Sequence, residues 1–427
     1  MSASMKQIHP AMPPSPHVAE GGRGVSGALA GVPSAEGPAK EARHAPPASA
    51  RTQGERDAPP ASARTHHEAM IPPASARTAR EAAQEPLLVR ACRKEPVERT
   101  PVWFMRQAGR CLAEYRTLRE KHGILEIAKT PELCAKVTRM PVDRLGVDGA
   151  VLYADIMLPL DGMGVPFHIQ PDLGPIIERP IRSMADIDAL RIVDAEGATP
   201  YLFETIRALR GELDPNVALI GFAGAPFTLV SYLIEGRPSR DHARTKAMLF
   251  GEPDLWDALM RTVVEVLVRY LNAQIAAGVQ VVQLFDSWVG ALAPDDYERH
   301  VLPHTREIFS RIGNTVPRIH FGTGNPALLG LMGQAGADVV SVDWRQPLDA
   351  AWDAIGPAQG IQGNLDPALC LAPFAVAAAG ARDVLRRAAG RPGHVFNLGH
   401  GVLPDTDADL LARLVELVAI ESAAVPA

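Results

Sequence analysis

Eight short apolar runs, separated by longer segments of helical periodicity, constrain the fold of this chain more than any other feature of its sequence. Most of the runs are continuous and rich in β-branched residues, which is typical of strands buried on both faces of a parallel sheet. A strand followed by a helix, repeated eight times, predicts a single closed (β/α)8 TIM barrel over residues 87–427. The runs are PVWFMR (101–106), GAVLYAD (149–155), VALIGFA (217–223), VQVVQLF (279–285), PRIHF (317–321), DVVSVD (338–343), GIQGNL (360–365) and HVFNL (394–398).

The segments between these runs predict helices. They comprise residues 131–145, 199–212, 241–277, 296–311, 325–335, 370–389 and 406–422. An open, doubly wound sheet is the alternative arrangement, but such a sheet usually carries a glycine fingerprint directly after its first strand. The first run is followed here by MRQAGR, which lacks the GxGxxG spacing, so the barrel is favoured.

Residues 1–86 differ sharply from the rest of the chain. They contain 13 of the 38 prolines and none of the 22 aromatic residues, and PPASART occurs at 46–52, 59–65 and 72–78. Such a segment buries too little apolar surface to offset its ordering entropy, so we expect a disordered tail. Its nine Lys or Arg against eight Asp or Glu do not match a transit peptide. A partner-binding arm, or a start site upstream of the one used in the cell, are the alternatives.

Charge and cysteine content exclude several classes of protein. The formal net charge of −6 argues against a general nucleic-acid-binding protein. No apolar run approaches the roughly 18 residues that a membrane span requires. The four cysteines lie far apart without a CxxC pair, so neither a disulfide framework nor a cysteine zinc site is expected. We therefore expect a protein of the reducing cytoplasm without a cysteine metal site.

Polar residues directly after the runs are the candidates for a functional site, because catalytic groups in such barrels follow the carboxyl ends of the strands. Arg106 and Arg110 flank a short segment that contains Gly109. If a turn follows the first run, both guanidinium groups can face one cavity and bind carboxylates. Ordinary solvated arginines on a loop are the alternative.

Asp155 closes the second run and is followed by further apolar residues, so its carboxylate needs a cationic or N–H partner. We interpret it as an acceptor for ligand N–H groups or a stabiliser of developing positive charge, with a structural role in a loop as the alternative. His400 lies between two glycines in NLGHG. This histidine, Tyr232 in TLVSYLIEG and Ser287 in LFDSWVG are weaker candidates, since each alone is compatible with a structural role.

Long motifs carry a family resemblance. PVWFMRQAGR followed by EYR, and GAPFTLVSYLIEG further on, resemble the two signatures of the uroporphyrinogen decarboxylases of tetrapyrrole biosynthesis. The resemblance extends over the rest of the folded part, and none of it lies in the tail. The further matching segments are YADIMLPLDGMG, QLFDSWVG, VDWR, QGNLDP and FNLGHGVLPDT.

The resemblance implies a (β/α)8 barrel that is typically a homodimer and uses neither a metal nor an organic cofactor. It implies that Asp155 meets the pyrrole N–H groups and that further residues contact the carboxylates or the ring. These implied pocket residues are Arg106, Gln107, Ala108, Gly109, Arg110, Tyr232, Ser287 and His400.

The implied reaction converts the four acetate side chains of uroporphyrinogen III to methyl groups, giving coproporphyrinogen III. Loss of CO₂ from such an acetate needs an electron sink, which a pyrrole becomes when a ring carbon is protonated. Under this interpretation Asp155 stabilises the cationic intermediate, while Arg106 and Arg110 position the acetate and bind the propionates.

A corrinoid or thiol methyltransferase of the same barrel superfamily is the nearest alternative. It would need a zinc ion held by His-x-Cys and a distant Cys, whereas the corresponding segment is His320, Phe321 and Gly322, and His400 stands at the late position. A non-catalytic porphyrinogen-binding homologue is the other alternative. It is disfavoured because every candidate polar residue is present.

Overall fold

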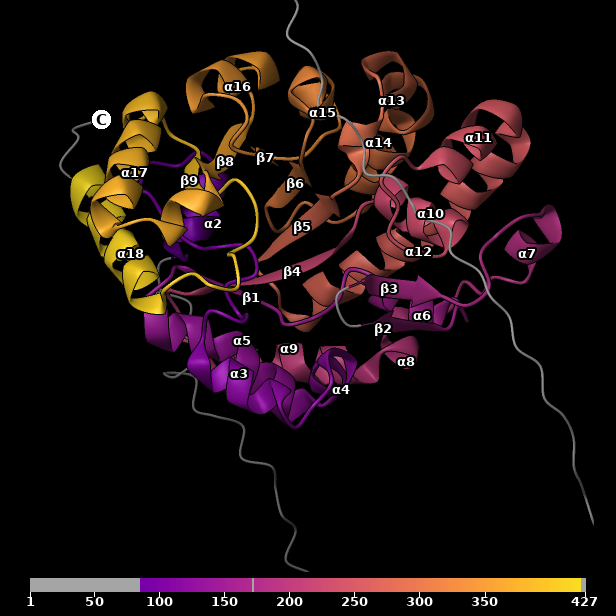
Figure 1. Cartoon of the computed structure of the whole chain (residues 1–427), viewed down its shortest axis with the longest axis horizontal. Coiled ribbons are helices and arrows are strands. Elements are labelled where there is room, and N and C mark those ends of the chain that lie inside the picture. Colours follow the sequence, from indigo (N-terminus) through magenta and orange to yellow (C-terminus); the bar gives the residue numbers. More distant parts are fainter. Residues whose placement is uncertain (1–84, 171–172, 424–427) are drawn as a thin grey trace, which may run out of the picture. The chain divides into compact units, whose positions relative to one another are not determined.

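Seven parallel strands form the central sheet, in the order β1-β4-β5-β6-β7-β8-β9. The computed structural model describes residues 85–170 and 173–423, and Figure 1 shows the strands curling around a common centre with helices outside them. The predicted disordered tail, except for Glu85 and Pro86, lies outside the described residues. The strands are β1 (Gly149–Val151), β4 (Ala218–Gly224), β5 (Val281–Asp286), β6 (Arg318–Gly322), β7 (Val339–Ser341), β8 (Gly360–Leu365) and β9 (His394–Leu398).

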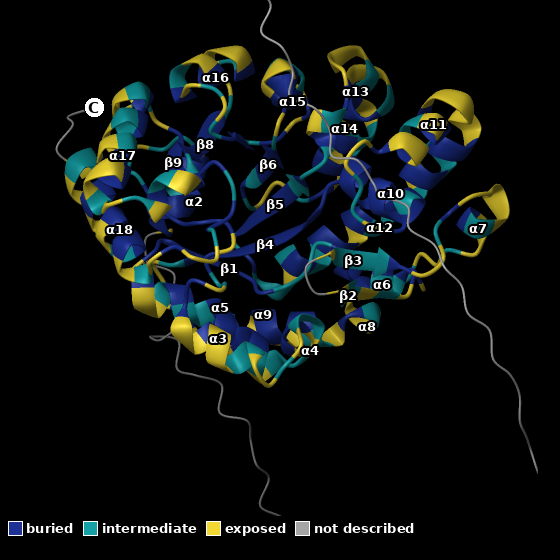
Figure 2. Cartoon of the chain, in the orientation of Figure 1, coloured by how far each residue is buried: buried dark blue, intermediate teal, exposed yellow. Residues whose placement is uncertain are grey.

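Burial of these strands confirms the interpretation of the continuous apolar runs. All residues of β1, β4, β7, β8 and β9 are buried, as Figure 2 shows for the centre of the fold. The mixed α/β class with a parallel sheet is therefore confirmed. Seven of the eight predicted runs contain a strand.

The remaining run, 101–106, makes a single β-bridge instead of a strand. Val102 pairs in parallel with Phe396 of β9, and on its other side its carbonyl accepts a hydrogen bond of 2.8 Å from the Asp148 N–H, just before β1. Side chains bind the backbone N–H groups that a strand would pair: the Val102 N–H donates to the Asp148 carboxylate at 2.8 Å and the Phe104 N–H to Gln107 Oε1 at 2.9 Å. The prediction of a regular strand here is wrong because these side chains replace the ladder.

The predicted helices are present, but prolines divide some of them. The predicted helix 241–277 is two helices, because Pro253 has no N–H to continue the first and begins the second. Within the described residues, no helix is long and apolar enough to cross a bilayer. The helices are α2 (Leu87–Cys92), α3 (Ala113–Arg119), α4 (Ile124–Lys129), α5 (Pro131–Leu145), α6 (Leu158–Gly162), α7 (Met184–Asp188), α8 (Ala195–Ala198), α9 (Pro200–Glu212), α10 (Pro226–Glu235), α11 (Ala243–Gly251), α12 (Pro253–Ala277), α13 (Pro294–His300), α14 (Leu302–Arg311), α15 (Leu329–Gly333), α16 (Leu348–Ile355), α17 (Phe374–Ala388) and α18 (Ala408–Ala423), with short 3-10 helices at Val289–Ala291, Pro326–Leu328 and Pro367–Leu371.

A two-stranded antiparallel hairpin was not predicted. It consists of β2 (Phe167–Gln170) and β3 (Gly174–Ile177), with Phe167 paired to Ile177 and Gln170 to Gly174. Gly174, the first residue of β3, adopts a φ of 102°, a conformation that glycine tolerates best. The hairpin lies in the long segment between β1 and β4, after α6 (Figure 1).

Buried polar side chains link the strands across the inside of the sheet. The Trp103 indole N–H donates to Gln362 Oε1 at 2.9 Å, and the Gln362 amide in turn donates to Gln283 at 3.1 Å and to Ser341 at 2.9 Å. All four residues are fully buried. This network ties the 101–104 segment to β5, β7 and β8, so the segment is fixed without regular strand pairing.

We predict that Asp148→Ala lowers the free energy of unfolding by about 2–4 kcal/mol. Asp148 is 7% exposed and accepts hydrogen bonds from the Val102 N–H and from both terminal nitrogens of Arg99 at 2.8 and 2.7 Å. Urea unfolding would measure the loss. Asp143→Ala is the matched control, because the Asp143 side chain is 63% exposed and lies 3.6 Å from Arg139, and equal losses in the two variants would contradict the prediction.

Candidate active site

The structure brings most of the predicted site residues together at the carboxyl ends of the strands. Arg106 follows the bridged segment, Asp155 follows β1, Tyr232 lies on α10 after β4, and His400 follows β9. Burial raises the pKa of Asp155 and Tyr232 and lowers that of His400, and the positive charge of Arg106 contributes a smaller lowering to each. The Arg106 side chain packs against Gly401, the residue after His400. Ser287 directly follows β5 and is half-buried.

An unusual backbone turn orients Arg106. Its φ of 59° places it in the left-handed region, which residues with a Cβ rarely adopt. Two glycines permit the arrangement. A Cβ on Gly109 would lie 2.7 Å from the Arg106 carbonyl oxygen, and a Cβ on Gly401 would overlap the Arg106 side chain. The side chain therefore passes over the NLGHG loop toward His400.

Gln107 is fully buried, and both the oxygen and the nitrogen of its side-chain amide make hydrogen bonds within the protein. Its Oε1 accepts from the Phe104 N–H at 2.9 Å and its Nε2 donates to the Gly149 carbonyl at 2.8 Å. The side chain thus fastens the turn to the start of β1. Neighbouring Ala108 and Gly109 are half-buried in the same turn.

Arg106 and Arg110 are both exposed, and their guanidinium groups make no hydrogen bond within the described ranges 85–170 and 173–423. The Arg110 carbonyl accepts a hydrogen bond of 2.7 Å from Arg116, which fixes the backbone of the loop but leaves the side chain free. Both cations can therefore bind an external anion without first breaking an ion pair.

The Asp155 carboxyl group is half-buried, and one of its oxygens is committed to the protein. Oδ1 accepts the backbone N–H of Met157 at 2.8 Å, and Oδ2 accepts no hydrogen bond from the described part of the chain. Burial raises the pKa of Asp155, and the Met157 N–H and the charge of Arg106 offset only part of this effect. The free oxygen can accept a ligand N–H group.

A buried network holds the loop that carries Ser287. The Thr228 hydroxyl, on α10, donates to Asp286 Oδ1 at 3.0 Å and accepts the Trp288 backbone N–H at 3.3 Å. The Trp288 ring then packs edge-on against Tyr232, with centroids 5.9 Å apart. Burial raises the pKa of Tyr232 to about 12, so its hydroxyl remains a hydrogen-bond donor at neutral pH.

His400 is half-buried among rings and cations. Burial, followed by the charges of Arg106 and Arg345, lowers its pKa to about 4. The Phe321 and Trp344 rings lie 6.2 and 6.5 Å from it between centroids. His400 is consequently neutral at physiological pH and can donate or accept one hydrogen bond at each ring nitrogen.

Sequence reasoning missed the aromatic lining and one arginine. Phe285 lies between two other rings, with centroids 5.3 Å from Phe222 and 5.7 Å from Phe321. The alternation of inward and outward residues along β4, β5 and β6 was the available signal, because these three residues share one face. Trp344 and Arg345 follow β7, directly after Asp343.

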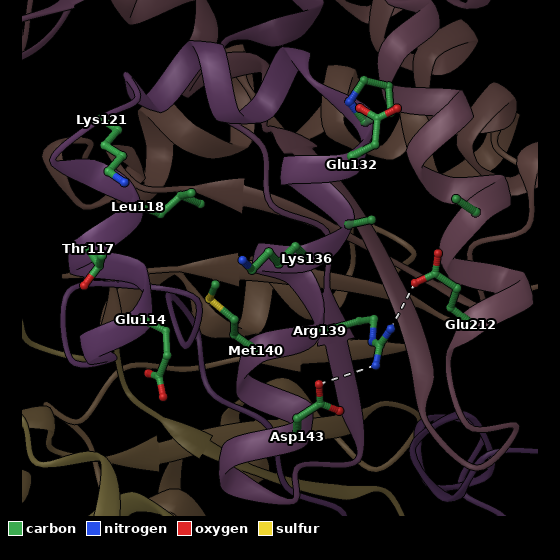
Figure 3. A pocket seen from close by; sticks show the side chains of 13 residues that line it. Glu114, Thr117, Leu118, Lys121, Glu132, Lys136, Arg139, Met140, Asp143 and Glu212 are labelled. Atoms are coloured by element: carbon green, nitrogen blue, oxygen red, sulfur yellow. Dashed lines mark hydrogen bonds and ion pairs between the residues drawn. The ribbon is translucent and has the colours of Figure 1, made fainter.

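A cavity of about 830 Å³ lies away from this site, among α3, α5 and α9. Figure 3 shows it lined by side chains of both charges, with Arg139 paired to Asp143 and Glu212. None of its lining residues follows the carboxyl end of a strand. It therefore has no part in the strand-end site.

Comparisons with known proteins agree with the motifs. The uroporphyrinogen decarboxylase (URO-D) family matches residues 83–420. The uroporphyrinogen decarboxylase of Sorangium cellulosum is 53% identical over 327 residues, covering 76% of this chain and 93% of that protein. The one from Streptomyces coelicolor is 54% identical over 327 residues, covering 76% and 92%. This chain belongs to the uroporphyrinogen decarboxylase family.

The fold of this family member also resembles a solved methyltransferase from Methanosarcina mazei, with a TM-score of 0.68 and 21% identity. The match covers 78% of this chain and 98% of that one. At this identity the likeness shows a shared TIM-barrel-like fold and nothing of the reaction. Family membership makes the chain a carboxy-lyase of tetrapyrrole biosynthesis.

We predict that His400→Gln reduces the dependence of stability on pH below neutrality. The pKa of His400 is about 4 in the folded protein against an ordinary 6.5, so the unfolded chain binds a proton between these values and the folded chain does not. The free energy of unfolding therefore falls as the pH falls through this window. In the variant we expect a slope smaller by up to about 1 kcal/mol per pH unit.

Urea unfolding at several pH values between about 7 and 5 would measure this slope. The buried His394, whose pKa is also lowered to about 4, keeps its contribution in the variant, so some dependence remains. An unchanged slope would show that His400 does not titrate as its burial requires.

Proposed function

We propose that this family member removes the carboxyl groups from all four acetate side chains of uroporphyrinogen III and releases coproporphyrinogen III, without a metal or an organic cofactor. The observation that carries the proposal is the Asp155 carboxylate, which lies at the strand ends with one oxygen free of hydrogen bonds from the described residues. Its burial and its nearness to Arg106 match the need for an anion that faces the pyrrole N–H groups.

The chemistry follows from the charge that develops on the ring. A proton adds to a ring carbon beside the acetate-bearing carbon, and the pyrrole becomes a cation. The bond between the acetate methylene and its carboxyl carbon then breaks, its electron pair neutralises the ring, and CO₂ leaves. The exocyclic methylene that results takes up a proton to become a methyl group, and the ring carbon loses the added proton.

Asp155 contributes by preorganised electrostatics. Burial disfavours the negative charge of Asp155, so the carboxylate is stabilised most when a cation forms next to it. The neutral substrate ring binds through its N–H groups, whereas the cationic intermediate also interacts with the full charge. The carboxylate therefore stabilises the transition state more than the ground state, which is the condition for catalysis.

The other candidates hold the periphery of the substrate. Arg106 and Arg110, without protein hydrogen bonds in the described residues, would bind its carboxylates, and Arg106 would lie nearest the reacting acetate. Tyr232, Ser287 and His400 would donate hydrogen bonds to carboxylates or contact the ring. Gln107 would act through the backbone turn that it anchors, with Ala108 and Gly109 allowing close approach.

The methyltransferase alternative rests on fold alone. His320, which stands where that alternative would require a zinc ligand, is fully buried and packs on Phe309 with centroids 5.6 Å apart. Its side chain lies on the helix-facing side of β6, since Phe321 occupies the opposite face. Stoichiometric zinc in the purified protein would favour that alternative.

We also propose that the 101–104 segment occupies the position of the eighth strand and closes the barrel. Residues 1–86 would form a separate tail. A cytoplasmic homodimer is proposed from the family resemblance. Sedimentation that shows only monomer at working concentration would contradict the dimer. A large loss of activity on deleting residues 1–85 would contradict the tail's independence from the catalytic part.

We predict that Asp155→Asn lowers kcat at least about 1000-fold. The asparagine can still accept the Met157 N–H, so the loop keeps its hydrogen bond while the charge is lost. The variant should also be more stable than the unsubstituted protein at neutral pH. The pKa of Asp155 is raised on folding, so the ionised carboxylate destabilises the fold at pH values above that pKa, and the variant lacks this cost.

An anaerobic assay that follows coproporphyrinogen from chemically reduced uroporphyrin, together with urea unfolding, would test both parts. Arg110→Ala is the comparison variant, since it removes a substrate contact but no charge under the ring. Its KM should rise by about tenfold with a smaller change in kcat. Full activity of Asp155→Ala would refute the mechanism, and binding of the substrate without any product would favour the porphyrinogen carrier.

A further inference from the structure

A buried carboxylate joins the loops after β6 and β7. Asp343 is 4% exposed, and its Oδ2 accepts hydrogen bonds from the Gly324 N–H at 2.5 Å and the Thr323 hydroxyl at 3.2 Å. Its Oδ1 accepts the backbone N–H of Arg345 at 2.9 Å. The same Asp343 forms an ion pair with the Arg345 side chain, whose Nη1 lies 2.5 Å from Oδ2. Asp343 therefore fixes both the backbone and one edge of Arg345.

The Arg345 guanidinium group stacks on a ring, and part of it makes no hydrogen bond to the described residues. Its Cζ lies 4.2 Å from the centroid of the Trp344 ring, and its Nη1 also donates to the Thr323 hydroxyl at 3.3 Å. Within residues 85–170 and 173–423, Nε and Nη2 make no hydrogen bond, and the side chain is 46% exposed. A guanidinium stacked on a ring, with one edge anchored and the other free, is preorganised for a planar anion.

Arg345 lies at the carboxyl ends of the strands, like the other site residues. The Trp344 ring on which it stacks lies 6.5 Å from the His400 ring, and the charge of Arg345 is among the causes that lower the pKa of His400. Through the Trp344 ring, Arg345 is thus placed beside His400.

We propose that Arg345 binds a peripheral carboxylate of the tetrapyrrole substrate and that Asp343 is its positioning residue. This inference rests on the proposed function and extends it, because Arg106 and Arg110 alone do not match the many carboxylates that the substrate carries around its ring. Arg345, the third arginine, lies in the loop after β7. In this proposal the substrate carboxylate that it binds is not the acetate that reacts next to Asp155, so Arg345 contributes to affinity and not to the chemical step.

Arg345→Gln and Arg345→Met test this assignment. Gln keeps one hydrogen-bond donor for Asp343, while Met keeps the length of the stack on Trp344 without charge. We expect the KM for uroporphyrinogen to rise about tenfold in both, with kcat changed less than about twofold. The dissociation constant of oxidised uroporphyrin, measured by fluorescence titration, should rise by the same factor.

Arg391→Gln is the matched control. The Arg391 Cζ lies 4.1 Å from the Trp352 centroid and its side chain is 39% exposed, so it reproduces the stack and exposure of Arg345. It precedes β9 and therefore lies at the amino ends of the strands. We expect its KM and porphyrin affinity to equal those of the unsubstituted protein.

Unchanged affinity in the Arg345 variants, or an equal loss in Arg391→Gln, would overturn the proposal. A loss confined to kcat would also overturn it, because it would place Arg345 in the chemical step. Failure of the proposed function is a separate outcome, seen as no product from the unsubstituted protein. The porphyrin titration does not require turnover, so it measures the contribution of Arg345 in either case.

Discussion

Burial disfavours the ionised form of the Asp155 carboxyl group, and the neighbouring groups at the carboxyl ends of the strands offset this effect only in part. Burial raises the pKa of the carboxyl group, while the Met157 N–H and the charge of Arg106 partly offset that effect. A direct ion pair with Arg106 would stabilise the carboxylate further, but it would neutralise the charge that the proposed mechanism requires. Among the described residues Arg106 is instead unpaired, so under that mechanism a ring that becomes positive can interact with a carboxylate whose Oδ2 accepts no hydrogen bond from them.

This separation of charges depends on backbone features that lie before β1. Arg106 is directed by a left-handed φ of 59°, and the turn is held by the buried Gln107 amide, which connects Phe104 to Gly149. Because the same amide binds the first residue of β1, a shift of the turn would disturb the strand that leads to Asp155. The cation and the anion of the site are therefore positioned by one shared anchor.

The sequence was sufficient to predict most of the sheet, because continuous apolar runs have few other uses than strands buried on both faces. It was insufficient for the run 101–106, where the Asp148 and Gln107 side chains replace strand partners that periodicity cannot distinguish. At the site, the polar residues after each run were predictable from barrel geometry. The role of Gln107 as an anchor and the hydrogen bond from Gly324 to the Asp343 carboxylate depend on contacts between separate segments, which no local pattern encodes.

The two kinds of side chain at the mouth serve different parts of a large anionic ligand. The Phe222, Phe285 and Phe321 rings form an apolar lining, which favours a flat, electron-rich macrocycle over a hydrated small anion. Arg106 and Arg110 lie in the loop before α3 and Arg345 lies in the loop after β7, and under the proposed function they bind carboxylates at the edge of the ring. Under the proposed function, a protein with a net charge of −6 binds a polyanion through cations placed locally at the strand ends. In that proposal Asp155 is the anion that the ring itself approaches, and its sign favours a positive intermediate.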